Sequence, residues 1–351
     1  MFCHTISKTY LEKWKIKDKK DSIYVFNKNN LSNQGEIRDL TNLTKTELGY
    51  TNYYYLKIED CDHKIFDNMF QDLIDEINKQ YILKFNKLEI KTATQFRLAY
   101  LKHEDKLKIY RRDNNVEIKL SRINKLILDS WNISKKRYIE DFFSKEIEND
   151  WQKVVNEFET IIKTKAKLSK FAREKLILFI ATQINRNHKK HNEKIKITQN
   201  DEILKKILIV SIYEFIKIYN HEQEDNNDNY IFETYKQLKK TNLHITILHT
   251  ESSFITTDNP IITYKHNHKD SILIPITPNI CLIIQNSLIE SLSIKKINSI
   301  ETKKINNELI NNAINNIVYF DKIITELYWI YSKEKEKQIA FLFTLTILIN
   351  D

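Results

Sequence analysis

Glycine is almost missing from this chain of 351 residues, which contains only Gly35 and Gly49. A share of about 7% is usual. Walker A loops, GxGxxG dinucleotide-binding turns and GxSxG nucleophile elbows each need closely spaced glycines, because the backbone must approach a phosphate or turn sharply there. The sequence therefore excludes P-loop NTPases, standard Rossmann enzymes, protein kinases and α/β-hydrolases.

Cysteine and long hydrophobic runs are also scarce. Cys3, Cys61 and Cys281 are an odd number, far apart and without CxxC spacing, which argues against a disulfide framework or a cysteine zinc site. The apolar run Ile339–Ile349 has 11 residues, whereas a membrane-spanning helix needs about 20. Residues 1–15 lack the features of a signal peptide. We therefore expect a cytosolic protein with no membrane segment.

Basic residues outnumber acidic ones, so the chain carries a formal net charge of +9. Such an excess favours polyanions by long-range attraction, which makes a nucleic acid or a nucleotide the expected partner. The abundance of Ile, Lys and Asn also indicates an AT-rich coding sequence, which enriches lysine without any functional demand. With 41% hydrophobic residues the chain is expected to be globular.

Apolar spacing divides the chain into three parts. Residues 1–60 contain short extended segments and the helical TYLEKW, residues 61–235 form a helical block, and residues 236–351 are β-rich with terminal helices. Short apolar strands at both ends would leave faces exposed unless they joined one sheet. We therefore predict an α+β fold in which a large helical block packs on a mixed β-sheet formed by the N- and C-terminal segments.

All the prolines fall in one short part of the chain, at Pro260, Pro275 and Pro278. In TTDNPI a strand is expected to end in a turn, because Asp258 and Asn259 can bond their own backbone and Pro260 keeps Asn259 out of helical geometry. Taken alone, this pattern predicts only an Asx turn at a strand end.

Four short motifs follow one another along the chain, and the proline positions belong to them. The motifs are HTISKTYL at His4–Leu11, QINR at Gln183–Arg186, FITTDNP at Phe254–Pro260 and IPITP at Ile274–Pro278. In order and spacing they resemble the bacterial domain of unknown function 4238 family, although Ser7 and Lys8 stand where that family has proline and arginine. The resemblance spans nearly the whole chain. It implies an α+β fold with a helical middle, but it supplies no reaction, because the family's activity is not established.

Polar residues from distant parts of the chain are predicted to face inward. Strand alternation directs His4 inward, helix phase does the same for Gln183 and Arg186, and the turn at the end of a buried strand does so for Asp258. A buried guanidinium without a partner costs several kcal/mol. Arg186 therefore needs a carboxylate, for which Asp258 is the first candidate and Glu148 the second.

These residues form an inventory for phosphoryl chemistry. His4 can move a proton, Arg186 can stabilise developing phosphate charge, and Asp258 can orient either of them. The candidates for contacts with substrate are Tyr10, Gln183 and Asn259. The inventory predicts phosphodiester hydrolysis on a nucleic acid or nucleotide, as in a toxin or phage-defence effector, with no metal site and no identifiable cofactor. The alternative is a non-catalytic binding or scaffold protein whose inward polar residues form a structural network.

A sharper motif competes with this set. RNHKKH, Arg186 to His191, matches the Arg-x4-His pattern of the HEPN ribonucleases, and the range Arg97–His103 is a looser match. Residues five apart lie about 140° around a regular helix. Arg186 and His191 could therefore cooperate only if the helix ends between them.

Metal-dependent chemistry has weaker support in the sequence. His188 and His191 share a helix face, but no third ligand stands at a recognisable zinc spacing. The EIK triplets at Glu89–Lys91 and Glu117–Lys119 are similar to those of restriction-type nucleases, and Asp113 precedes the second. With 29% charged residues, such triplets are expected by chance.

Overall fold

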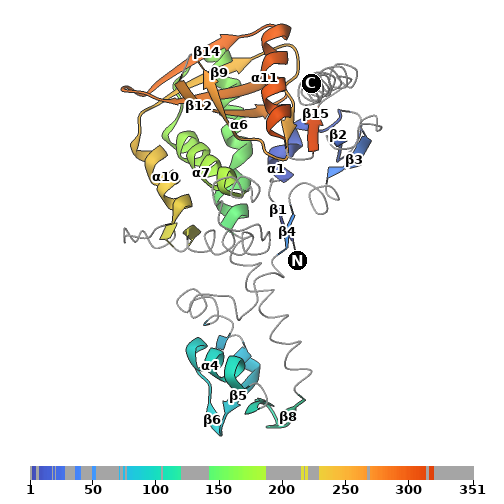
Figure 1. Cartoon of the computed structure of the whole chain (residues 1–351), viewed down its shortest axis with the longest axis vertical. Helices are drawn as coiled ribbons and strands as arrows, with labels where there is room; N and C mark the ends of the chain where they lie inside the picture. The colour runs from blue at the N-terminus through green and yellow to red at the C-terminus, as the bar shows by residue number, and fades with distance from the viewer. Residues whose placement is uncertain are drawn as a thin grey trace, which may run out of the picture. The chain divides into compact units, whose positions relative to one another are not determined.

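The computed structural model of the protein falls into two units (Figure 1). It describes residues 2–4, 8–17, 19, 21–27, 36–40, 50–52, 71, 74–75, 77–103, 106–119, 142–186, 215–216, 218–219, 229–266, 269–313 and 316–319. The first unit comprises residues 1–3, 50–150 and 177–237, and the second comprises residues 4–49, 151–176 and 238–351. The limits expected at 60/61 and 235/236 lie near the changes between units at 49/50 and 237/238, whereas residues 151–176 belong to the second unit.

A five-stranded sheet dominates the second unit. Its strand order is β11 (Ile262–His266), β12 (Lys269–Thr277), β13 (Ile280–Asn286), β9 (Leu243–His249) and β14 (Ser291–Lys296). Neighbouring strands run antiparallel except β14, which pairs parallel to β9. All five strands lie within residues 236–351, the part of the chain expected to be β-rich, although β14 was not anticipated. This mixed sheet is built from residues 243–296 alone.

A second sheet joins the two ends of the chain. Its strand order is β10 (Thr256–Thr257), β15 (Asn316–Tyr319), β2 (Ser22–Asn27) and β3 (Glu36–Asp39). The prediction that N- and C-terminal segments share one sheet is therefore confirmed. The shared sheet is antiparallel throughout rather than mixed. Near the N-terminus, β1 (Phe2–His4) pairs with β4 (Tyr50–Asn52).

Helices cover both faces of the five-stranded sheet (Figure 1). On one face lies α11 (Ser299–Asn312), whose Leu309 shares a core with Leu248 of β9. The opposite face, which includes Leu243, meets the loop between two other helices. These helices are α6 (Asn149–Thr164) and the start of α7 (Lys170–Arg186). The sequence explains the two covered faces, because residues 280–284 form a continuous apolar run without polar alternation.

The N-terminal helix predicted from TYLEKW is present. It consists of α1 (Lys8–Leu11), which continues as a 3-10 turn over Glu12–Trp14. Tyr10, Leu11 and Trp14 recur at helical spacing, and all three are fully buried. This short helix therefore enters the core of the second unit.

The first unit contains a small sheet where the sequence led us to expect only helices. The sheet is antiparallel, in the order β6 (Leu88–Glu89), β5 (Tyr81–Phe85), β7 (Leu107–Arg111) and β8 (Glu117–Ile118). The helical expectation is wrong here because YILKF and LKIYR alternate with the period of a strand, with Leu83 and Ile109 fully buried. The helices of this unit include α4 (Ala93–His103) and most of α10 (Tyr230–Lys240), and a π-helical turn at Ser144–Glu148 precedes α6.

The scarcity of glycine is visible in the backbone. Among the described residues, five other than glycine have positive φ: Asp21, Asn86, Lys87, Asn115 and Lys165. Asn86 (φ 49°) and Lys87 (φ 71°) form the two-residue turn between β5 and β6, a place where type I′ geometry requires positive φ at both positions. Lys165 (φ 56°) terminates α6, and its N–H donates to the carbonyl of Ile161 (2.8 Å). Lysine therefore stands at positions where glycine is usual.

Candidate functional site

Tyr10 connects three of the four sequence motifs in the second unit. Its hydroxyl donates to the carbonyl oxygen of Pro275 and forms a second hydrogen bond with Oγ1 of Thr256 (2.9 Å). HTISKTYL, FITTDNP and IPITP therefore meet at one hydroxyl group. We call this contact among Tyr10, Thr256 and Pro275 the motif junction.

The motif junction is enclosed by aromatic rings. The ring centroid of Tyr10 lies 5.1 Å from that of Trp14 and 6.0 Å from that of Trp151. Burial raises the pKa of Tyr10 well above its usual value, although the bond to Thr256 opposes this effect. The phenol consequently stays protonated and keeps its bond to Pro275.

Two further hydrogen bonds reinforce the junction. The N–H of Phe254 donates to the carbonyl of Pro278 (2.6 Å), and Nε1 of Trp14 donates to the carbonyl of Phe254 (3.4 Å). Both ends of IPITP are thus bonded to residues of the other two motifs. The concentration of prolines in the sequence accordingly marks one place in the fold.

Helix α11 holds the FITTDNP segment from the other side. The side chain of Asn306 accepts the N–H of Ile255 (3.1 Å) and donates to the carbonyl of Ser253 (3.0 Å). Oγ1 of Thr302 lies 2.9 Å from Oγ1 of Thr250. The sequence analysis missed Asn306 and Thr302. The available signal was their position on the buried face of a helix that otherwise presents isoleucine and leucine.

Asp258 and Asn259 lie directly after β10 and are 8% and 5% exposed, which confirms the inward prediction for Asp258. Oγ1 of Thr257 accepts the N–H of Asn259 (3.1 Å), so a threonine side chain contributes to this turn. The side-chain amide of Asn259 donates to the carbonyl of Asn312 at the end of α11 (3.1 Å). The segment is therefore positioned by two side chains that directly precede Pro260, those of Thr257 and Asn259.

The other predicted site residues belong to different elements. Gln183 is 5% exposed in α7, which confirms its inward orientation, and Glu148 is half-buried at the end of the π-helical turn. His4 ends β1 and Arg186 ends α7, and the side chains of both lie outside the described residues. Gln183, Arg186 and Glu148 fall in the first unit, whereas Asp258 falls in the second. The pairing of Arg186 with Asp258 stays a prediction.

The competing nuclease and metal motifs fall on other surfaces or outside the described residues. His188 and His191 lie outside them, as does the side chain of His103. Glu117 accepts hydrogen bonds from Lys108 (3.2 Å) and the Tyr110 hydroxyl (3.3 Å) on an exposed face of the small sheet. In the part of the chain that the structure describes, no three His, Cys, Asp or Glu side chains come together as metal ligands would.

Comparison with known proteins agrees with the motifs. Residues 4–322 match the family described as "Protein of unknown function (DUF4238)". The chain belongs to this family. The match confirms the resemblance drawn from the four motifs, three of which meet at the motif junction. No curated protein and no solved structure matches this DUF4238 protein. Within the described residues, no helix has both the length and the apolar character needed to cross a membrane.

Proposed function

We propose that this DUF4238 protein is a cytosolic hydrolase that cleaves phosphodiester bonds in a nucleic acid or nucleotide, and that it acts as a bacterial toxin or phage-defence effector. The observation that carries the proposal is the burial of polar motif residues, Gln183, Asp258 and Asn259, in positions where apolar residues would pack at lower cost. The net charge of +9 supports a polyanionic substrate.

The proposed roles follow from the chemistry of the side chains. His4 transfers the proton of the attacking or leaving oxygen, since an imidazole titrates near neutral pH. Arg186 stabilises the charge that develops on the phosphate, and Asp258 orients one of these two groups. Asn259 and Gln183 contact the substrate through their amides. Tyr10 holds the backbone next to Asp258 in place through the motif junction, since its hydroxyl bonds Thr256 and Pro275.

A second candidate function is that of a non-catalytic binding or scaffold protein. The observation in its favour is that the described hydrogen bonds of Tyr10, Asn259 and Asn306 all go to other parts of the same chain. Such bonds stabilise one arrangement of the backbone without any substrate. In this alternative the four motifs stabilise the fold and take no part in catalysis, and Arg186 and Asp258 form a structural ion pair.

One experiment separates the two functions. The wild type, His4→Ala and the control variant His266→Ala are expressed in the same bacterial host, and growth, RNA and DNA integrity and folded yield are measured. His266 lies half-buried on β11 and belongs to none of the motifs. A hydrolase predicts growth arrest and nucleic-acid cleavage by the wild type and His266→Ala, and their loss in His4→Ala at equal folded yield. Equal behaviour of all three proteins would refute catalysis by His4 and favour the scaffold.

A further inference from the structure

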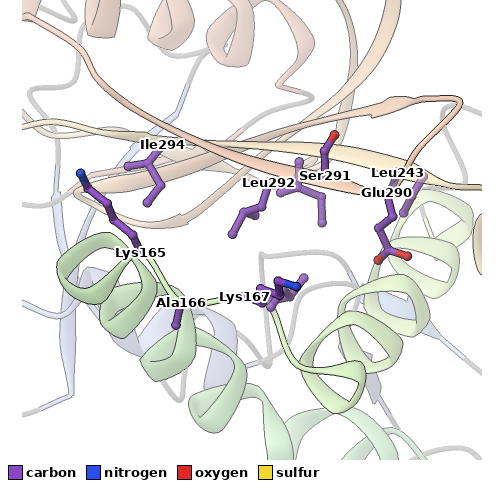
Figure 2. A pocket seen from close by; sticks show the side chains of 10 residues that line it. Lys165, Ala166, Lys167, Leu243, Glu290, Ser291, Leu292 and Ile294 are labelled. Atoms are coloured by element: carbon purple, nitrogen blue, oxygen red, sulfur yellow. The ribbon is translucent and has the colours of Figure 1, made fainter.

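A pocket of about 610 Å³ lies in the second unit, between the α6–α7 loop and strands β9 and β14 (Figure 2). Small-molecule sites typically have volumes of about 300–1,000 Å³. Its aliphatic lining consists of Ala166, Leu168, Leu243, Ile245, Leu292 and Ile294. Among the described residues that line it, none is aromatic and none belongs to the four motifs. The inference from this pocket does not rest on the proposed hydrolase.

The charges around the pocket are unbalanced. Glu290 lines one end, and Nε of Arg173 pairs with it at 2.7 Å. Lys165 and Lys167 line the loop side, and both are exposed. Among the described residues no carboxylate pairs with either lysine. The rim therefore carries two uncompensated positive charges beside an aliphatic wall.

The loop that carries the lysines is fixed in place before any ligand arrives. At its start, Lys165 adopts the left-handed conformation and bonds back to Ile161 of α6. At its end, Glu157 accepts both the N–H (2.6 Å) and the hydroxyl (2.7 Å) of Ser169. Ser169 in turn caps α7 by accepting the N–H of Ala172 (3.1 Å). Little ordering entropy would be lost on binding, which favours a specific site.

Two exposed apolar residues come directly before Glu290 in the sequence, and Glu290 lines one end of the pocket. The two preceding residues, Leu288 and Ile289, are 95% and 75% exposed. Large aliphatic side chains exposed beside a hydrophobic pocket indicate an interaction site rather than a solvated surface. The tail of a linear ligand could cover these side chains after passing along Leu292 and Leu243.

We propose that this pocket binds an amphiphilic anion, namely a carboxylate with an unbranched aliphatic chain. The carboxylate lies on the loop side of the pocket, which carries Lys165 and Lys167, and the chain runs along the aliphatic wall of β9 and β14 toward Leu288. A nucleotide fits this lining less well, because the described lining residues offer a base no aromatic ring to stack on. A cationic amphiphile would be repelled by the two lysines.

Calorimetric titration of the full chain with octanoate and decanoate, below their micellar concentrations, tests the proposal. Two additional buried methylenes should tighten binding about tenfold from octanoate to decanoate. Decyltrimethylammonium should bind much more weakly than decanoate. The double variant Lys165→Gln/Lys167→Gln should weaken decanoate binding at least fivefold, and Ile294→Trp, which fills the pocket, should abolish it. The matched control Lys269→Gln, an exposed lysine of β12 outside the pocket, should bind like the wild type.

Three results would overturn the proposal. The first is the absence of decanoate binding by the folded wild type. The second is binding that the double lysine variant, folded by thermal melting, leaves unchanged. The third is equal affinity for decanoate and decyltrimethylammonium, which would show that the lysines do not select the head group.

Discussion

Removing the hydroxyl of Tyr10 should destabilise the second unit without changing its shape. Tyr10→Phe keeps the ring between Trp14 and Trp151 but deletes the group that bonds Thr256 and Pro275. The hydroxyl and carbonyl left behind are buried, so water cannot replace the lost partner. Each buried polar group left unsatisfied costs about 1–3 kcal/mol. Because the Thr256 hydroxyl can rotate toward another acceptor, we expect a total loss of about 2–4 kcal/mol.

A thermal melt and a urea titration measure this loss. For a unit of this size, the expected loss corresponds to a midpoint lowered by roughly 5–15 °C. Tyr264→Phe is the matched control in the same unit, since the Tyr264 hydroxyl makes no hydrogen bond among the described residues and its removal should change stability by less than about 0.5 kcal/mol. Thr256→Val and the double variant with Tyr10→Phe complete a cycle, in which we expect a coupling energy of about 1 kcal/mol.

The reasoning would be refuted if Tyr10→Phe melted like the wild type. Strict additivity of the Tyr10 and Thr256 substitutions would refute the bond between them in particular. A strong loss in Tyr264→Phe equal to that in Tyr10→Phe would show that the melt reports general repacking and not the motif junction.

Three other substitutions test the structure at separate places. Asn306→Ala should cost about 2–3 kcal/mol in urea unfolding, because the buried N–H of Ile255 and the half-buried carbonyl of Ser253 lose their partner. Asn307→Ala is the control, since its Oδ1 has no partner among the described residues and its removal should change stability little. Lys87→Gly should raise the stability of the small sheet by about 1 kcal/mol, because glycine accepts positive φ without strain, and an unchanged melt would contradict the turn geometry. Burial raises the pKa of Cys281 and raises that of Tyr319 to about 12. The unfolded chain therefore releases the Cys281 proton first, and stability falls above about pH 8.5 by up to about 1.4 kcal/mol per pH unit. The contribution of Tyr319 begins only above about pH 10, where an unfolded tyrosine loses its proton. Cys281→Ala should flatten this decline between about pH 8.5 and 10 in urea titrations, and an unchanged slope would contradict the burial of the thiol.

Local pattern was sufficient for much of the five-stranded sheet of the second unit, although not for β14. The alternating and continuous apolar runs between residues 243 and 286 predicted the strands, because their period or uniform burial follows from the pleat of a sheet. The helix over TYLEKW was predicted for the same kind of reason, since its apolar residues recur at helical spacing. In the first unit the same reasoning failed for residues 81–118. Their short alternating runs lie beside longer segments with helical spacing, so the whole region was predicted to be helical although it contains the four strands β5 to β8.

The sequence by itself determined which motifs characterise the family, and the tertiary structure decided which atoms of these motifs bond to one another. The order of four motifs was enough to identify the DUF4238 family. Helix phase marked Gln183 as buried, and the turn at a strand end did the same for Asp258. The bond from Tyr10 to Pro275 and the support from Asn306 depend on backbone groups more than 50 residues apart in sequence. Backbone donors and acceptors are the same in every residue, so no side-chain pattern records which of them a distant tyrosine or asparagine will reach. The pocket between the α6–α7 loop and β14 could not be predicted from the sequence either. Its lysines and its aliphatic wall lie far apart in the chain and become neighbours only in the folded structure.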